Sequence, residues 1–314
     1  MTRMKMNAQP RIIFMGTPEF AVASLDALVK AGFNIVAAVT APDKPAGRGM
    51  KMNESAVKRY AVAANIPVLQ PAKLRDPEFI EQLRSLHADL QIVVAFRMLP
   101  EIVWNMPPFG TINVHASLLP KYRGAAPINW AIINGEKMTG ITTFRLVHEI
   151  DKGNILLQRS VEIGEDETAG ELHDKLKNLG ARVLVETIAG LIEGTVEEKT
   201  QPETGAQHHA PKLTTDTGKI DWTLGAHQVH NLVRGLSPAP GAFTSLEGKT
   251  LKVYRTTVAV QNTGKQPGEW ETDSKTFLRF AAKDGWVYIT ELQLEGKKRM
   301  EIKSFLMGFR PAGK

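Results

Sequence analysis

The sequence has no cysteine among its 314 residues. This absence excludes a disulfide framework and thiol catalysis, and it removes the commonest ligands of structural zinc sites. No apolar run approaches the roughly 20 residues that a membrane-spanning helix needs. Residues 1–10 are polar and lack the apolar core of a secretory signal. We therefore expect a soluble, cytoplasmic protein with no membrane attachment.

The familiar motifs for phosphate binding and nucleophilic catalysis are also missing. There is no Gly-x-Ser-x-Gly nucleophile elbow, and no Gly-x-Gly-x-x-Gly dinucleotide motif follows the first predicted strand. Gly248-Lys249-Thr250 ends like a phosphate-binding loop, but six residues separate it from Gly241, where the motif needs four. The sequence is therefore not that of an obvious hydrolase, kinase or dehydrogenase.

What the sequence does contain is an ordinary globular composition, with 43% hydrophobic and 23% charged residues. The length suits two ordinary domains. The net charge is +6, and residues 213–314 hold 15 Lys and Arg against 10 Asp and Glu. A basic final third is typical of proteins with an anionic partner such as nucleic acid, although many proteins with this imbalance bind none.

The first part of the chain alternates strands and helices. A buried strand is predicted at 11–15, then a helix with Thr17 as N-cap and Pro18 as its first residue, then a strand at 35–40. Further helices are predicted near 55–65, 77–87, 125–134 and 169–193, and further strands at 92–96, 141–146 and 155–158. This order is typical of an α/β domain with a parallel sheet.

The last part of the chain has a different pattern. A polar segment containing His208 and His209 indicates a solvated linker, because no third metal ligand lies at a useful spacing. After a helix at 226–236, strands are predicted at 251–260, 277–281 and 286–292, which suggests a small barrel or sandwich. We therefore predict a domain at 1–200, a linker at 201–212 and a domain at 213–314.

The segment 111–127 holds the most unusual side chains. It begins as a β-strand, so Asn113 and His115 project from one face while Ile112 and Val114 project from the other. Two polar side chains together on an otherwise apolar strand indicate a functional site. The alternative is that Asn113 caps the strand and His115 is a hydrogen-bonded core residue.

A second unusual segment, 41–52, is rich in glycine, proline and basic residues and shows no periodicity, which predicts a long irregular loop. Its positive charges are Lys44, Arg48 and Lys51. Such a loop suits contact with a nucleic acid, and a solvated surface loop is the alternative.

Four segments together resemble the folate-dependent formyltransferases. The most specific is Asn113-x-His115-x-Ser117-Leu-Leu-Pro120, followed by Arg123-Gly124-Ala-Ala-Pro-Ile-Asn-Trp130. The other three are 14–21, 45–49 and 149–153, in the family's order. The sequence departs from the family at Lys152 and Asn154, where Thr and Asp are frequent, and in 96–100, where many members have a Tyr and a Gly.

The resemblance implies a Rossmann-like N-terminal formyltransferase domain and a smaller C-terminal β-barrel like an OB-fold. It implies transfer of a formyl group from 10-formyltetrahydrofolate to the α-amine of methionine esterified to initiator tRNA, without a metal. It assigns the catalytic roles to Asn113, His115 and Asp151. The expected partners are initiator methionyl-tRNA and the folate donor, with the protein as a monomer.

The resemblance also predicts the binding residues. The predicted folate-binding residues are Phe96, Met98, Leu99, Ser117, Leu118, Leu119, Pro120, Val147 and Glu149. The Ser117 hydroxyl has the alternative role of satisfying a turn, and Gly124 is expected to matter through its backbone conformation. Lys44, Arg48 and Lys51 are predicted to reach the tRNA acceptor stem. The C-terminal domain is expected to contact the tRNA backbone, with 297–299 as its obvious basic cluster.

Two other functions compete with this prediction. A formyltransferase acting on a small amine, such as a sugar nucleotide or a purine precursor, would share Asn113, His115 and Asp151 but would not need a basic C-terminal module. A non-catalytic RNA-binding protein would not need the three catalytic side chains at all.

Overall fold

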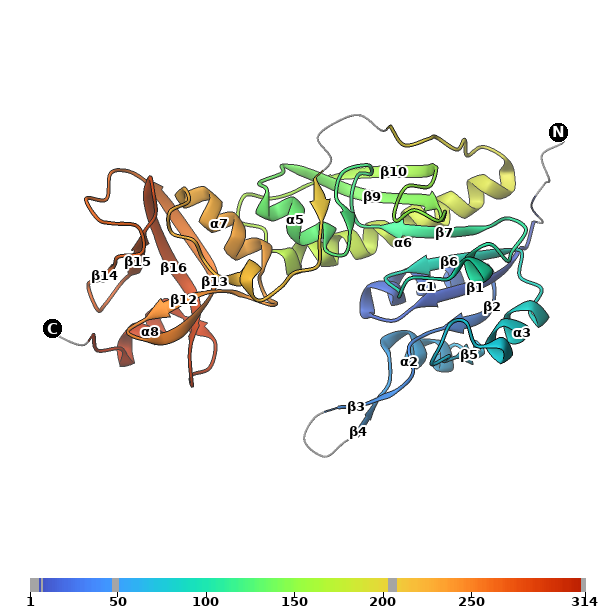
Figure 1. The fold of residues 1–314 in the computed structure, drawn as a ribbon, viewed down its shortest axis with the longest axis horizontal. Coiled ribbons are helices and arrows are strands. Elements are labelled where there is room, and N and C mark those ends of the chain that lie inside the picture. Colours follow the sequence, from blue (N-terminus) through green and yellow to red (C-terminus); the bar gives the residue numbers. More distant parts are fainter. Residues whose placement is uncertain (1–5, 7, 47–50, 203–207, 312–314) are drawn as a thin grey trace. The chain divides into compact units, whose positions relative to one another are not determined.

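The fold is described from a computed structural model of the chain. It covers residue 6 and residues 8–46, 51–202 and 208–311. Two compact units emerge from the contacts between residues (Figure 1). The first comprises 1–123, 140–161 and 173–208, and the second comprises 124–139, 162–172 and 209–314. Within the described residues, no helix has the length and apolar character needed to cross a membrane.

A seven-stranded sheet forms the centre of the first unit, in the order β10-β9-β7-β6-β1-β2-β5 (Figure 1). Its strands are β1 (Arg11–Gly16), β2 (Asn34–Val39), β5 (Val68–Leu69), β6 (Leu90–Val94), β7 (Thr111–His115), β9 (Met138–Arg145) and β10 (Ile155–Glu162). β5, β2, β1, β6 and β7 run parallel, and β9 is antiparallel to β7. The predicted α/β, Rossmann-like first domain is confirmed.

Helices cover both faces of this sheet. On one face lie α1 (Glu19–Lys30) and α6 (Ala169–Glu193), which meet where Phe20 contacts His173. Gly180 of α6 packs directly over Val114 and Ile141. On the other face, α3 (Pro77–Ser85) and α4 (Glu101–Trp104) share one apolar cluster with Ile13 and Val93. α2 (Ala56–Ala63) follows β4 and packs on α1.

The start of α1 differs from the prediction by one residue. Pro18 occupies the N-cap position, with φ −81° and ψ 175°, and the helix begins at Glu19. Because Pro18 is extended, Thr17 lies outside the helix and its hydroxyl does not cap it. The predicted cap was therefore wrong, while the predicted position of the helix is correct.

The segment predicted as a long irregular loop contains a short strand pair. β3 (Lys44–Ala46) and β4 (Lys51–Asn53) are antiparallel, with Lys44 opposite Asn53. The prediction of a long irregular loop was therefore wrong for these residues, because pairing within the segment satisfies its own backbone groups. Residues 47–50 between the strands, Arg48 among them, lie outside the described residues.

A second short strand pair follows Tyr122. β8 (Arg123–Gly124) pairs with β11 (His209–Ala210), which lies in the predicted linker. A Cβ on Gly124 would lie 2.5 Å from the carbonyl oxygen of Ala210, and its φ is +124°. Both the conformation and the lack of space therefore require glycine at position 124. α5 (Pro127–Ile133) follows it.

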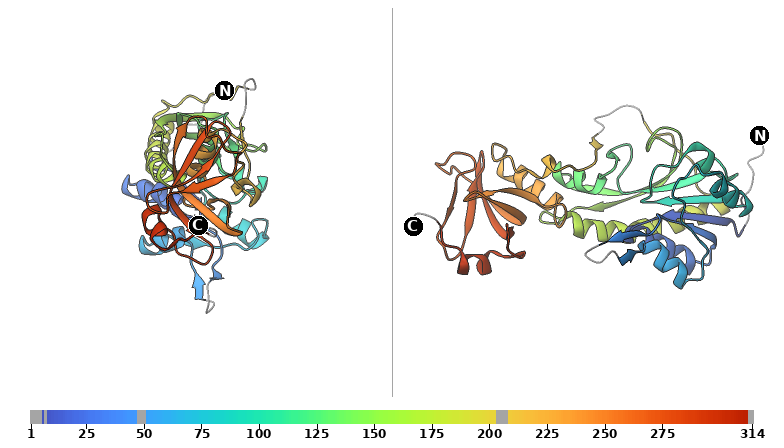
Figure 2. Two further views of the ribbon diagram at one scale, coloured as in Figure 1. Left: turned by 90° about the vertical axis from the view of Figure 1, so that its left-hand side faces the viewer. Right: turned by 60° about the horizontal axis from the view of Figure 1, so that its bottom comes forward.

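The second unit contains a curled antiparallel sheet (Figure 2). Its strands are β12 (Ala242–Leu246), β13 (Lys249–Val260), β16 (Gly285–Leu294), β15 (Leu278–Ala281) and β14 (Trp270–Thr272) in order, with β17 (Met300–Glu301) against β16. The register of β13 on β16 shifts between Val253 and Thr256, as at a bulge, which adds curvature. α7 (Ala226–Gly235) and α8 (Ile302–Gly308) pack on the same core, and η1 is Asp216–Gly218. The predicted small OB-like barrel is confirmed.

A capping box at the start of α6 makes stability depend on pH. Thr168 donates through its backbone N–H and its hydroxyl to the Glu171 carboxylate, and Arg255 pairs with the same carboxylate. The Thr168 backbone bond is the main cause that lowers the pKa of Glu171 from 4.5 to about 2. A carboxyl with a lowered folded-state pKa stabilises the protein above pH 4.5, and this contribution is lost as the pH falls towards 2.

We therefore expect Glu171→Gln to lower the free energy of unfolding by about 0.3–1.5 kcal/mol at neutral pH. The variant should also show a smaller loss of stability between pH 4.5 and pH 2 than the wild-type protein. Urea denaturation at several pH values measures both effects. Glu193→Gln, at the other end of the same helix, is the matched control. Equal pH dependence in wild-type and Glu171→Gln proteins would contradict the assignment.

Candidate active site

Asn113 and His115 lie on β7, on the sheet face away from α6. Their cross-strand partners on β9 are Phe144 and Thr142, and Asn113 lies beside Val93 of β6. Asn113 is half-buried, and no described residue forms a hydrogen bond with its side-chain amide. Its NH₂ group is therefore available to a bound molecule.

The orientation of the His115 ring is defined by a backbone carbonyl. Its Nε2 lies 2.8 Å from the carbonyl oxygen of Tyr122. Because a carbonyl only accepts, Nε2 must carry a hydrogen, and Nδ1 of the neutral ring then has a free lone pair. The Phe144 ring packs edge-on against the imidazole. With only 7% of its side chain exposed, the ring has little freedom to turn.

The structure brings Asp151 to this lone pair. Oδ2 of Asp151 lies 3.9 Å from Nδ1 of His115, and 12% of its side chain is exposed. This distance is longer than a direct hydrogen bond. The two groups form an ion pair only when the ring is protonated. The carboxylate is therefore placed to stabilise the imidazolium that forms if Nδ1 takes up a proton.

Asp151 lies in the loop between β9 and β10, and the conformation of this loop brings its carboxylate to His115. Asp151 itself has φ +55°, a left-handed conformation that costs a residue with a Cβ roughly 1–2 kcal/mol. A Cβ on Gly153 would lie 1.6 Å from the carbonyl oxygen of Arg145, so only glycine fits there. The loop thus holds Asp151 in an unfavourable conformation that its surroundings must maintain.

The turn after β7 is held from two neighbouring strands. Ser117 donates through its hydroxyl to the Lys121 carbonyl, at 2.6 Å. Thr142 donates to the Ser117 carbonyl and accepts from the backbone N–H of Leu119, and Gln158 donates to the Leu119 carbonyl. The alternative role considered for Ser117, satisfying a turn, is therefore what its hydroxyl performs. The peptide bond between Leu119 and Pro120 is cis.

The predicted folate-binding residues differ in exposure. Leu99 and Leu119 are buried, Phe96, Leu118, Pro120 and Val147 are half-buried, and Met98 and Glu149 are exposed. Phe96 and Leu99 belong to the same apolar cluster as Leu146, so the segments 96–99 and 146–149 lie together. Met98 is 76% exposed, and Ile150, which directly follows the second segment, is 60% exposed, so apolar side chains at both places are accessible.

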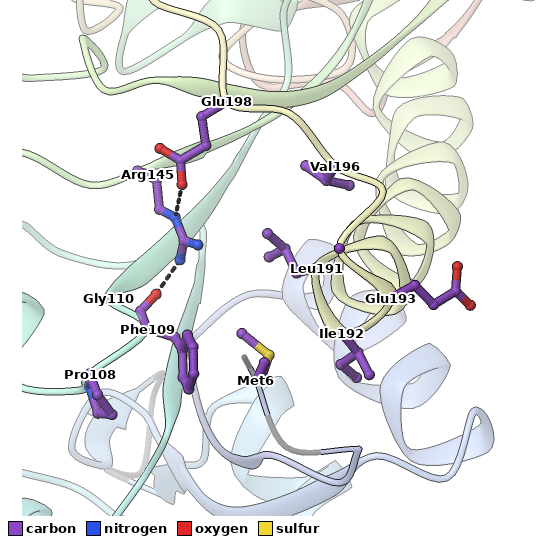
Figure 3. Close-up of a pocket in the computed structure, with 11 residues that line it drawn as sticks. Met6, Pro108, Phe109, Gly110, Arg145, Leu191, Ile192, Glu193, Val196 and Glu198 are labelled. Atoms are coloured by element: carbon purple, nitrogen blue, oxygen red, sulfur yellow. Dashed lines mark hydrogen bonds and ion pairs between the residues drawn. The ribbon is translucent and has the colours of Figure 1, made fainter. Parts of the chain in front are cut away.

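The cavities among the described residues of the first unit include two of note. One, of about 470 Å³, lies where β1, β2 and β6 end and is lined by Thr17, Ala41 and Phe96. Ligands of open α/β sheets bind at this edge. The other, of about 610 Å³, lies near the start of β7, where Arg145 bonds to Glu198 and the Phe109 carbonyl (Figure 3). None of the predicted site residues lines this second cavity.

The predicted tRNA-binding residues are only partly described. Lys44 is exposed at the start of β3 and borders the 470 Å³ cavity, and Lys51 begins β4. Arg48 lies outside the described residues. In the second unit, Arg299 of the basic cluster bonds to Glu291 and stacks on Tyr254, so part of its charge is already paired.

Several residues that shape the site were not predicted. Tyr122 holds the imidazole through its carbonyl, and Arg123 and Gln201 bond to the loop that carries Asp151. Tyr122 and Arg123 lie in the segment 111–127, which the sequence analysis identified. The role of Tyr122 could not be predicted, because every residue has a backbone carbonyl. Among the described residues, no three His, Asp or Glu side chains come together as a metal site.

The arrangement of a neutral donor, an oriented imidazole and a carboxylate on a Rossmann-like sheet suits acyl-type transfer. The model of the formyl transferase family matches residues 10–188, and that of its C-terminal domain matches residues 212–310. The chain belongs to the formyl transferase family.

Its relatives have a more specific name. It is 51% identical to the methionyl-tRNA formyltransferase of Parabacteroides distasonis, over 96% of both chains. It is 50% identical to that of Bacteroides fragilis, over 95% of both chains. A solved N-formyltransferase from Helicobacter canadensis, in complex with folinic acid and dTDP-3-aminofucose, shares the fold with a TM-score of 0.66 at 20% identity. That alignment covers 93% of this chain and 100% of the other.

Proposed function

We infer that this protein transfers a formyl group from 10-formyltetrahydrofolate to the α-amine of methionyl initiator tRNA, giving formylmethionyl-tRNA for translation initiation. The observation that carries this inference is the identity of 50–51% to methionyl-tRNA formyltransferases along nearly the whole chain. Both the catalytic unit and the C-terminal β domain lie within that match.

The reaction defines what the site must do. The amine nitrogen of methionine bonds to the formyl carbon, and a tetrahedral intermediate with a negative oxygen forms. The bond from that carbon to N10 of the folate then breaks, tetrahydrofolate leaves with a proton on N10, and the amine loses one proton. Such a reaction needs a donor for the oxyanion and a group that handles the proton.

His115 and Asp151 are proposed to handle the proton. The free lone pair on Nδ1 of His115 takes the proton from the attacking amine, and the ring can return it to N10. Asp151, 3.9 Å away, stabilises the imidazolium in between. The carbonyl of Tyr122 fixes the tautomer that makes Nδ1 the basic nitrogen.

Asn113 is proposed to donate its NH₂ to the oxyanion. It lies two residues from His115 on the same strand face, so one carbonyl group can meet both side chains. The support for this role is that its amide has no hydrogen-bond partner among the described residues, although it is half-buried. An amide donor adds no charge of its own to the site.

The folate donor fits the apolar segments beside this pair. Phe96, Met98 and Leu99, with Val147 and Glu149, offer a flat ring system an apolar surface and one carboxylate. Ser117 to Pro120 form the rigid turn behind it. The folate supplies the activated formyl group, and these residues would bind and orient it.

For the tRNA, we propose the basic segment around β3 and β4, with Lys44, Arg48 and Lys51, and the C-terminal domain as contact surfaces. Their positive charge supports binding to a phosphate backbone. We further propose domains at 1–200 and 213–314 joined by 201–212, and a monomer that acts in the cytoplasm.

The deciding experiment offers three amines in parallel with 10-formyltetrahydrofolate: methionyl initiator tRNA, free methionine and an amino-sugar nucleotide. We expect formylation of the charged tRNA alone, measured as acid-stable formylmethionine. Transfer only to the sugar nucleotide would be consistent with the proposed catalytic residues but would contradict the proposal that tRNA is the substrate. Absence of transfer to any amine would contradict the function as a whole.

A further inference from the structure

We propose that Gln201 is a positioning residue that sets the place of the Asp151 carboxylate. The proposal rests on the function inferred above, in which Asp151 acts on His115. Gln201 lies between the parts of the chain that match the two family models, 10–188 and 212–310. It also lies far along the chain from the segment with Asn113 and His115.

The amide of Gln201 binds the backbone at Asp151 and just after it. Its Nε2 donates to the carbonyl oxygens of Asp151 and Gly153, each at 2.8 Å. Its Oε1 accepts from Arg123, at 2.6 Å from Nη2 and 3.2 Å from Nε. Arg123 also donates to the Asp151 carbonyl at 3.2 Å. The two hydrogens and both lone pairs of the amide are therefore used.

The residues just before Gln201 pair with the residues at the end of the same loop. Lys199 exchanges two backbone hydrogen bonds with Ile155, at 2.7 and 2.8 Å. Glu198 pairs with Arg145 and accepts from Asn154. The segment 198–201 thus runs antiparallel to 151–155, and we call it the strap. Gln201 is a strap residue that hydrogen-bonds to the backbone of Asp151 itself.

Burial makes the Gln201 bonds hard to replace. Only 4% of the residue is exposed. Without the amide, the carbonyl groups of Asp151 and Gly153 would each lose a donor where water has little access. The loop also holds Asp151 at φ +55°, which persists only while its surroundings enforce it. Loss of Gln201 should let the loop relax and move the carboxylate away from Nδ1 of His115.

A shift of about 1 Å in a catalytic group costs about 10²-fold in rate. We therefore expect Gln201→Met, which keeps the volume but not the hydrogen bonds, to lower kcat about 10²-fold. The KM values for 10-formyltetrahydrofolate and methionyl-tRNA should change little, because Gln201 lines neither predicted binding surface. A raised KM with an unchanged kcat would overturn the proposal. So would a variant with the full activity of the wild-type protein.

The matched control is Gln91→Met. Gln91 is fully buried in the same unit and accepts a hydrogen bond from Thr111, at the opposite end of β7 from His115. We expect this variant to keep the wild-type kcat. If Gln201→Met does not fold, Gln201→Glu takes its place, since a carboxylate still accepts from Arg123 but cannot donate to both carbonyls.

A double-mutant cycle with Asp151→Asn separates positioning from general damage. Asp151→Asn alone should lower kcat about 10²–10⁴-fold. In that background Gln201→Met should cost no more than about threefold further, because the group it positions is already gone. An equal loss in both backgrounds would show a merely structural role and overturn the proposal. Full activity of Asp151→Asn would instead overturn the proposed role of Asp151 itself.

Discussion

Replacement of His115 by glutamine is expected to lower kcat for formyl transfer about 10²–10⁴-fold, the usual loss when a general acid–base is removed. The glutamine amide can still donate towards the Tyr122 carbonyl, so the strand and turn should stay intact. What disappears is the lone pair on Nδ1 beside Asp151, and with it the group that takes the amine's proton.

Rapid-quench measurement of a single turnover isolates this chemical step. His173→Gln is the control, because His173 lies on α6 and contacts Phe20 on the opposite face of the sheet. Binding of methionyl-tRNA should be the same in both variants and in the wild-type protein. A single-turnover rate within tenfold of wild type for His115→Gln would remove His115 from the chemistry.

Asn113→Ala is expected to lower kcat about 10²–10³-fold, the typical loss for one oxyanion donor. The half-buried amide has no partner among the described residues, so its removal leaves no protein group without a hydrogen bond. The free energy of unfolding should therefore change little while the rate falls.

Asn113→Asp sharpens this test, because aspartate has the same size but accepts where asparagine donates. Its negative charge would oppose the oxyanion, so it should be at least as slow as the alanine variant. Steady-state kcat and denaturant unfolding of both variants give the comparison. A loss below tenfold in Asn113→Ala would exclude the donor role.

Most of the fold followed from the sequence because its elements are strongly periodic. The strand at 11–15, the helix at 169–193 and the strand at 277–281 were predicted close to their observed bounds. The failures came where backbone pairing decides the conformation. β8 pairs with β11, and β3 pairs with β4. These strands are short, and no hydrophobic pattern in their sequences predicts them. β12 and α8 were not predicted either.

The residues of the candidate site differ in how far the sequence predicted their positions. Strand alternation alone placed Asn113 and His115 on one face, and the structure has them there. Nothing in the spacing of residues brought Asp151 to them, and only the family resemblance suggested it. Gln201 gave no signal, since a polar residue before a polar segment is the common pattern of a linker.

His115 and the residues that shape the site around it bond largely to main-chain oxygens. The imidazole of His115 bonds to the Tyr122 carbonyl, Ser117 to the Lys121 carbonyl, and Gln201 to the carbonyls of Asp151 and Gly153. A carbonyl is present whatever side chain the residue carries. The sequence can therefore drift at a position such as 121, whose side chain is exposed, while the acceptor stays in place, provided that the backbone path is kept.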